Sequence, residues 1–298
     1  MENIPDPIDK ILQVCGMNGP WEPLYATGVA NRIYATKDVV IRVAREHPEA
    51  LRDARTESIA ALVAYAAGVL TPRLLVFDDS RDLLDRPYSI WERINGETLG
   101  LLSSDPDSMP NTWRQIGHQM AILHVHVKQC DDPKQYLHEP ARDLNLESLC
   151  EKLVSTGQIS TDLAKEISIL IDELYAAVLE KAKICFLHSD VHDMNIMCTR
   201  GDELLALIDW GDAGWGDPTF DFAQIPLSAI PYVLEGYREM APDLLGGTLA
   251  ERLIWDKLYY AMTKSLENLS CSIPVDEFRQ FLNMNRITRR SLKFYLKR

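Results

Sequence analysis

A stretch between residues 186 and 222 constrains the fold of this 298-residue chain more than any other. It contains two short segments, Ile196–Thr199 and Leu204–Ile208, whose composition is typical of β-strands. Gly201 and Asp202 lie between them and are residue types that turn a chain tightly. The two segments are therefore predicted to form a β-hairpin, which brings the residue before the first strand next to the residue after the second.

Three polar side chains lie at the open end of this predicted hairpin. Asn195 precedes the first strand, Asp209 follows the second, and Asp190 lies five positions before Asn195. Mg²⁺ prefers hard oxygen ligands, usually one or two carboxylates together with phosphate oxygens, so Asn195 and Asp209 are candidate metal ligands. Asp190 is the candidate catalytic residue, placed to orient an attacking hydroxyl. Protein kinases use the same spacing, and the pattern therefore indicates phosphoryl transfer.

Two longer motifs enclose these residues. The first reads Leu187-His188-Ser189-Asp190, and the second reads Ile208-Asp209-Trp210-Gly211, followed by Gly216-Asp217-Pro218 and then Asp221. This combination resembles the aminoglycoside phosphotransferase family, small-molecule kinases with a protein-kinase-like fold. The family usually has Gly where this chain has Ser189. Because serine is also small, we expect only a local change there.

The resemblance implies an α+β, two-lobed protein-kinase-like fold. An N-terminal lobe over residues 1–94 would hold an antiparallel sheet with one main helix and bind the nucleotide. A larger, mainly helical lobe over residues 95–298 would carry catalysis and substrate binding. Local patterns agree, because strand-like segments dominate the first part and amphipathic helices the second. The predicted strands are 21–25, 32–35, 39–44, 74–77 and 88–93, and the main predicted helices are 48–68, 161–181, 247–270 and 276–297.

The resemblance also implies phosphate-binding residues in the first lobe. Gly28 and Asn31 follow the first strand, where a glycine loop covers the phosphates in kinase-like lobes, although a lone glycine equally suits a simple turn. Arg42 occupies the strand position where protein kinases have a phosphate-binding Lys, and the alternative is a solvated strand charge. Glu57 is expected to pair with Arg42. Glu49 lies on the same predicted helix, so the choice of Glu57 rests on family spacing.

The linker between the lobes and the loop after Asp190 supply the remaining candidates. Glu92, Arg93 and Ile94 lie where the family binds the adenine edge through backbone groups, so the sequence does not decide between ATP and GTP. Among the acidic residues of the second lobe, we select only Asp193 as a substrate-binding candidate, because it lies close to Asp190. The other acidic residues considered were Glu235, Glu239, Asp243, Glu251, Asp256 and Glu267.

The resemblance suggests supporting roles for other residues near Asp190. His188 is expected to order the catalytic loop by hydrogen bonding. Asp217 and Asp221 are expected to hold loop backbone and the start of a helix rather than to take part in the chemistry. His192 faces either the substrate or solvent, and the sequence does not choose between them.

Composition limits the partners and the compartment. The chain has 31 Lys and Arg against 44 Asp and Glu, a formal net charge of −13, which argues against a general nucleic-acid or anionic-membrane binder. The six cysteines form no Cys-x-x-Cys pair and have no zinc-ligand spacing, which is typical of reduced thiols. We find no signal-peptide pattern and no apolar run that could span a bilayer. We therefore expect a cytoplasmic protein, monomeric or homodimeric, without membrane or nucleic-acid partners.

The sequence thus predicts an ATP- and Mg²⁺-dependent O-phosphotransferase acting on a hydroxyl of a small, cationic molecule. Within the family that the motifs resemble, an antibiotic such as an aminoglycoside is the first choice of substrate. One alternative is a metabolite kinase of the choline, homoserine, methylthioribose or fructosamine type. Another is a nucleotide-binding regulator without catalysis, which the presence of Asp190, Asn195 and Asp209 together argues against.

Overall fold

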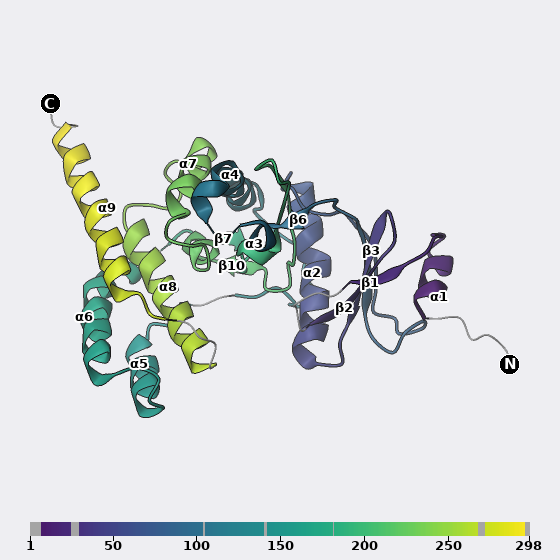
Figure 1. Cartoon of the computed structure of the whole chain (residues 1–298), viewed down its shortest axis with the longest axis horizontal. Helices are drawn as coiled ribbons and strands as arrows, with labels where there is room; N and C mark the ends of the chain where they lie inside the picture. The colour runs from purple at the N-terminus through teal and green to yellow at the C-terminus, as the bar shows by residue number, and fades with distance from the viewer. Residues whose placement is uncertain are drawn as a thin grey trace.

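The computed structural model describes residues 7–24, 30–103, 105–139, 142–180, 182–267 and 272–295. The chain has an antiparallel sheet at one end and a group of helices at the other, with α2 beside the sheet (Figure 1). This α+β architecture confirms the predicted fold class. The division into lobes at residue 94 stays a prediction.

The N-terminal sheet has five antiparallel strands in the order β1-β2-β3-β5-β4. Its central strand forms because β-branched residues alternate along it, with Val39, Ile41 and Val43 buried on one face. All five predicted strands and the first long helix are confirmed, to within one or two residues at their ends. The elements are α1 (Pro7–Val14), β1 (Glu22–Leu24), β2 (Asn31–Ala35), β3 (Val39–Ala44), α2 (Pro48–Ala66), β4 (Leu74–Asp78) and β5 (Tyr88–Glu92).

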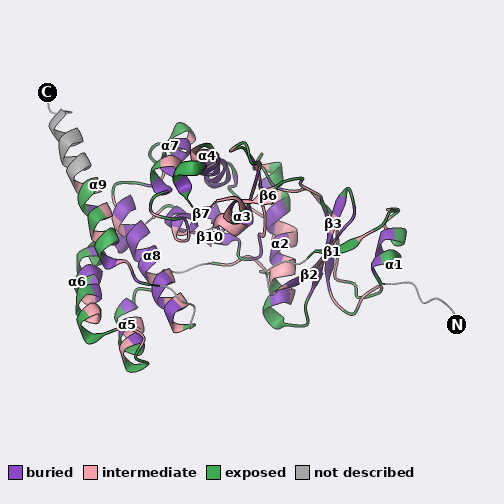
Figure 2. Cartoon of the chain, viewed as in Figure 1, coloured by how far each residue is buried: buried purple, intermediate pink, exposed green. Residues whose placement is uncertain are grey.

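Helices make up most of the remaining chain, and their buried faces form the larger core (Figure 2). The helices are α3 (Leu99–Leu102), η1 (Pro106–Ser108), α4 (Pro110–His126), α5 (Leu146–Ser155), α6 (Thr161–Val178), η3 (Pro218–Phe222), α7 (Ile230–Met240), α8 (Leu249–Leu266) and α9 (Val275–Tyr295). Helices α4 and α7 pack with their backbones in contact. A Cβ added at Gly117 would lie 1.8 Å from the carbonyl oxygen of Val233, and one added at Gly236 would lie 1.8 Å from that of Arg114. Only glycine fits at these two positions.

The predicted hairpin is confirmed and positions the candidate site. It consists of β8 (Ile196–Cys198) and β9 (Leu204–Leu207), and β6 (Glu97–Thr98) pairs with its outer edge. The amide of Ile208 donates to the carbonyl of Asn195 at 3.0 Å, which extends the pairing to the polar end of the hairpin. Asn195 itself ends the short η2 helix (Asp193–Asn195).

A second short ribbon anchors the segment before Asp190. Strand β7 (Cys185–Leu187) pairs with β10 (Gly214–Gly216), which follows Asp209 in the chain. The two chain segments that carry the candidate residues are thereby joined twice. Among the helices of the described residues, none is both long and apolar enough to cross a membrane.

Candidate active site

The carboxylate of Asp190 is held by amide donors on both oxygens. Asn195 Nδ2 donates to Oδ2 at 2.8 Å and to the Asp190 carbonyl at 3.0 Å, and Gln224 Nε2 donates to Oδ1 at 2.5 Å. Burial raises the pKa of Asp190, but the hydrogen bond and charge of His192 lower it more, and the result is a pKa of about 2. The side chain is 25% exposed, so an ionised carboxylate faces incoming molecules.

The backbone before Asp190 is fixed by two buried side chains. His188 is buried, its Nε2 lies 3.0 Å from the carbonyl oxygen of Ile208, and its Nδ1 accepts from the Asp190 amide at 3.3 Å. The carboxylate of Asp221 accepts from the amides of His188 and Ser189 at 3.1 and 2.6 Å. The expected roles of His188 and Asp221 in ordering this loop are confirmed.

Ser189 has backbone geometry that favours glycine. Its φ is +68°, in the left-handed region, and its Oγ is buried without a hydrogen-bond partner. This explains why the family motif described above usually has Gly at this position. The change remains local, because the neighbouring bonds to Asp221 are intact.

Arg42, Glu57 and Asp209 meet as one charged group, which we call the open cluster. Arg42 Nη2 donates to Asp209 Oδ1 at 2.9 Å, and Arg42 Nη1 forms an ion pair with Glu57. Burial lowers the pKa of the Arg42 guanidinium, but the two carboxylates raise it well above its ordinary value. The expected Arg42–Glu57 pair is therefore present. The Asp209 side chain is 46% exposed, so the cluster faces solvent at this residue.

Oxygen atoms suited to a divalent cation lie at the end of the hairpin. Both hydrogen bonds of the Asn195 amide use its nitrogen, and no bond to its oxygen is found among the described residues. Asp209 uses Oδ1 for Arg42 and is otherwise open to solvent. An amide oxygen and a carboxylate match the hard-ligand preference of Mg²⁺. These two residues fit the predicted metal site.

The three linker candidates differ in whether their backbone amides are already hydrogen-bonded. The amides of Glu92 and Arg93 donate to the carbonyls of Arg73 and Asp38, each at 2.9 Å. For the Ile94 amide, no hydrogen bond is found within the described residues. Ile94 is therefore the linker candidate whose backbone donor is open to a base.

The two remaining nucleotide-binding candidates are Gly28 and Asn31. Gly28 lies outside the described residues. Asn31 is buried at the start of β2, and its carbonyl accepts from Arg45 Nε at 3.4 Å. A phosphate-binding role for either residue stays a prediction.

His192 lies between two carboxylates. Its Nε2 is 3.5 Å from Asp190 Oδ2, and its Nδ1 is 3.6 Å from Asp193 Oδ1. Burial lowers the pKa of His192, but hydrogen bonds and charges of Asp190 and Asp193 raise it to about 9. In the neutral imidazole Nδ1 accepts from the Met194 amide at 3.2 Å, so a proton on Nδ1 displaces that hydrogen bond. The Asp193 side chain is 45% exposed and remains accessible to a substrate.

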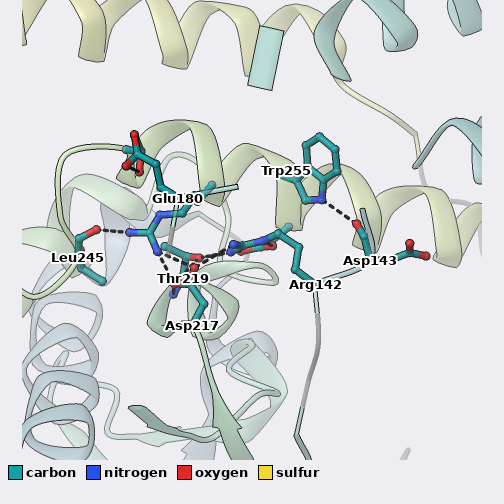
Figure 3. Close-up of polar contacts among 10 residues, drawn as sticks. Arg142, Asp143, Glu180, Asp217, Thr219, Leu245 and Trp255 are labelled. Carbon is teal, nitrogen blue, oxygen red and sulfur yellow. Dashed lines mark hydrogen bonds and ion pairs between the residues drawn. The ribbon is translucent and has the colours of Figure 1, made fainter. Parts of the chain in front are cut away.

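A second group of charges, which we call the sealed cluster, was not predicted from the sequence. Asp217 pairs with Arg142 at 2.9 Å and with Arg252 at 2.5 Å, and Asp256 binds Arg142 at 2.7 Å. The carboxylate of Asp217 also accepts from the Thr219 amide at 3.0 Å, so Asp217 caps the N-terminus of η3 (Figure 3). The Gly-Asp-Pro motif drew attention to Asp217, but nothing in the sequence indicated its distant arginine partners.

Several acids among the substrate candidates are already paired with arginines. Asp256 is buried against Arg142, and Glu235 and Glu239 pair with Arg114 on α4. Asp193 is the candidate acid that lies beside Asp190. A groove of about 520 Å³ between α7 and α9 is lined by none of Asp190, Asn195 and Asp209, so we do not assign it to this site.

Comparison with known families agrees with this geometry. The family model described as "Phosphotransferase enzyme family", abbreviated APH, matches residues 23–247, which is most of the chain and includes every described element of the site. The chain belongs to this family, and its activity is that of a phosphotransferase, a kinase. No curated protein sequence matches the chain.

Solved structures share the fold at low sequence identity. The gentamicin complex of APH(2'')-IIa has 17% identity and a TM-score of 0.59, with 96% of this chain and 95% of that chain covered. The GDP complex of aminoglycoside 2'-phosphotransferase-IIIa has 15% identity and a TM-score of 0.61, covering 91% and 93%. A choline/ethanolamine kinase family protein from Mesorhizobium loti has 19% identity and a TM-score of 0.55, covering 95% and 91%. The two-lobed kinase-like fold is thus shared along nearly the whole chain.

Proposed function

We propose that this phosphotransferase moves the γ-phosphoryl group of a nucleoside triphosphate to a hydroxyl of a small molecule, with Asp190 receiving the hydroxyl proton. The observation that carries the proposal is the state of Asp190. Its carboxylate is ionised, partly exposed and held by Asn195 and Gln224. In phosphoryl transfer the transition state is loose, so a weak, well-positioned base is sufficient.

The nucleotide side of the site is formed by the open cluster and Asn195. Arg42, fixed by Glu57, supplies a permanent positive charge for phosphate oxygens. Asp209 and Asn195 would hold Mg²⁺ through their oxygen atoms, and a bound ion would neutralise charge on the phosphates. In the free chain Arg42 balances the charge of Asp209, so the carboxylate is kept in place before ligands arrive.

His192 adds a positive charge on the acceptor side. When His192 is protonated, its Nε2 places a positive charge 3.5 Å from Asp190 Oδ2, where the transferred group gathers negative charge. A cation at this position stabilises developing charge. It also keeps the proton acceptor ionised, because it lowers the pKa of Asp190.

Both ATP and GTP remain candidate donors. Structurally similar proteins have been solved with ATP, with ADP and with GDP. Within the described residues the Ile94 amide is free to donate to the edge of a base, and this contact does not depend on the identity of a side chain. We therefore propose that the base, of either ATP or GTP, is bound through the backbone.

For the acceptor, a cationic antibiotic with free hydroxyls is our first candidate. The similar structures include a gentamicin complex, and the chain carries a net charge of −13. Asp193, exposed beside Asp190, offers a carboxylate to an ammonium group of the acceptor.

A small amino alcohol is the second candidate, and one observation favours it. A polycationic antibiotic needs several free carboxylates, yet Glu235, Glu239 and Asp256 are already paired with arginines. A single candidate acid beside Asp190, namely Asp193, suits a molecule with one positive charge. A choline/ethanolamine kinase family protein is also among the similar structures.

The test is release of nucleoside diphosphate by the purified chain with Mg-ATP and with Mg-GTP. Acceptors are gentamicin, kanamycin, spectinomycin, choline and ethanolamine, each at a range of concentrations. Strong stimulation by one compound, with a mass gain of one phosphate on that compound, supports the proposal and identifies its substrate class. Absence of both nucleotide binding and nucleotide turnover would overturn it.

A further inference from the structure

Gln224 contacts the proposed proton acceptor from a separate part of the fold. It lies between η3 and α7, whereas Asn195 comes from the catalytic loop itself. Gln224 Nε2 donates to Oδ1 of Asp190 at 2.5 Å, and Asn195 Nδ2 donates to Oδ2 at 2.8 Å. Each carboxylate oxygen thus has its own amide donor. Two donors from different segments fix the plane of a carboxylate more tightly than one donor does.

The backbone on both sides of Gln224 is held by a buried lysine. Lys257 on α8 is 7% exposed, and its Nζ donates to the carbonyl of Ala223 at 3.1 Å and also to the carbonyl of Ile225. Among the described residues, Lys257 has no carboxylate within ion-pair distance. Burial lowers the pKa of Lys257 to about 7.

A buried amine without a carboxylate partner calls for an explanation. Taking an ammonium out of water costs several kcal/mol as an order of magnitude. An apolar side chain of similar length, such as methionine, fills the same space without that cost. What only the amine of Lys257 provides is a pair of hydrogen bonds to the carbonyls that flank Gln224. These bonds satisfy two backbone acceptors and also fix where the Gln224 amide points.

We propose that Gln224 and Lys257 are positioning residues for phosphoryl transfer: Lys257 fixes the backbone at 223–225, and Gln224 in turn orients the carboxylate of Asp190. This inference rests on the proposed function of Asp190. In the step, the acceptor oxygen bonds to the γ-phosphorus and its proton passes to Asp190. The bond from the γ-phosphorus to the bridging oxygen breaks, and the nucleoside diphosphate leaves. Gln224 and Lys257 exchange no proton and form no covalent bond.

The first variant, Gln224→Leu, removes the donor and keeps most of the side-chain volume. We expect turnover to fall about tenfold, which corresponds to about 1.4 kcal/mol in the barrier. The KM for nucleotide stays unchanged, because Gln224 does not touch the open cluster. A loss of folding would lower turnover and nucleotide affinity together, so a fall in turnover at unchanged KM distinguishes positioning from a purely structural role.

The second variant, Lys257→Met, tests the link between the two residues. It should lower turnover without changing the KM for nucleotide, as Gln224→Leu does. The double variant should be no slower than Gln224→Leu alone, because both changes remove the same contact. Lys165→Met, at an exposed position on α6, serves as the matched control and leaves turnover unchanged.

The experiment measures nucleoside diphosphate release from Mg-ATP and Mg-GTP by the full chain at neutral pH, over a range of nucleotide concentrations that gives turnover and KM separately. Water serves as acceptor first, and then any compound that stimulates the wild type. Urea unfolding shows which variants are folded, and Gln224→Leu carries the test alone if Lys257→Met does not fold. The inference is supported by a slow Gln224→Leu variant, an unchanged KM for nucleotide and a non-additive double variant.

Two results would overturn it, and they are distinguishable. If Asp190→Asn is inactive while Gln224→Leu matches the wild type, the inference fails and the proposed function stands. If the folded wild type has turnover that Asp190→Asn retains, the proposed function fails and this inference fails with it.

Discussion

Two clusters of arginine and carboxylate in this molecule have similar composition and opposite surroundings. The open cluster of Arg42, Glu57 and Asp209 reaches solvent through Asp209, whose side chain is 46% exposed. In the sealed cluster the side chains are between 1% and 10% exposed; its members are Arg142, Asp217, Arg252 and Asp256.

This difference shows how burial separates a binding site from a structural support. In the sealed cluster each charge is compensated inside the protein, and the segments that it joins are fixed to each other (Figure 3). In the open cluster the carboxylate of Asp209 is partly exposed, so a charged ligand can bind to it. Each cluster contains an Asp with a Gly one or two positions away in the sequence: Asp209 precedes Gly211 by two positions, and Asp217 directly follows Gly216.

The largest effect is expected for Asp217→Asn in the sealed cluster. The substitution leaves Arg142 and Arg252 buried with one charge too few, so the free energy of unfolding should fall by about 3–5 kcal/mol. Urea unfolding measures the change. Asp193→Asn, at a carboxylate that is 45% exposed, is the control and should change stability little. An Asp217→Asn protein as stable as the wild type would remove the distinction between the clusters.

In the open cluster, Asp209→Asn should affect ligand binding rather than folding. The affinity for Mg-nucleotide should fall about 100-fold, as expected when a charged contact of roughly 3 kcal/mol is lost. The free energy of unfolding should change by less than about 1 kcal/mol, because the carboxylate is half-exposed. Calorimetric titration with Mg-ATP and Mg-GTP measures the first quantity, and urea unfolding measures the second. Unchanged Mg-nucleotide affinity would show that Asp209 holds no metal.

The pairing of His192 with Asp190 and Asp193 should appear as a pH dependence of stability. The pKa of His192 is raised from its ordinary value of 6.5 to about 9, so the pairing stabilises the fold fully below pH 6.5. That contribution is lost as the pH rises through 9. The free energy of unfolding of the wild type should exceed that of His192→Gln by roughly 1 kcal/mol at the lower pH, after allowance for solvent screening. Thermal unfolding of both proteins across this pH interval measures the difference in stability. A difference that does not change with pH would contradict the pairing of His192 with the two carboxylates.

The smallest effect is expected for Ser189→Gly. Glycine adopts the observed φ of +68° without strain and removes a buried, unpaired Oγ. The free energy of unfolding should therefore rise by about 1 kcal/mol, with turnover retained. Ser168→Gly, at a half-buried position in the middle of α6, is the contrasting control and should destabilise the protein. Destabilisation by Ser189→Gly would mean that the serine makes a contact of its own.

Local patterns were sufficient for the parts of the site that are close in sequence. The hairpin follows from two strand-like runs around Gly201-Asp202, and it brings Asn195 and Asp209 to one end. The pair of Arg42 and Glu57 needed the family resemblance as well, because Glu49 lies on the same helix and local pattern does not choose between the two.

Contacts between distant segments were not predictable in the same way. Gln224 contacts Asp190, and Lys257 contacts the backbone beside Gln224. No sequence motif around Gln224 or Lys257 indicates these contacts. Arg142 and Arg252 meet Asp217 only because a loop and a helix pack together. A single charged side chain in a sequence has many possible partners, and tertiary packing selects one.

The most direct test of the central claim compares turnover by wild type and Asp190→Asn under saturating Mg-nucleotide and the best acceptor. Both proteins should unfold at similar urea concentrations and bind nucleotide with similar affinity. We expect the variant to turn over about 100-fold or more slowly, the scale for losing a positioned proton acceptor. Turnover close to that of the wild type, with normal folding and binding, would contradict the assignment of Asp190 and the mechanism built on it.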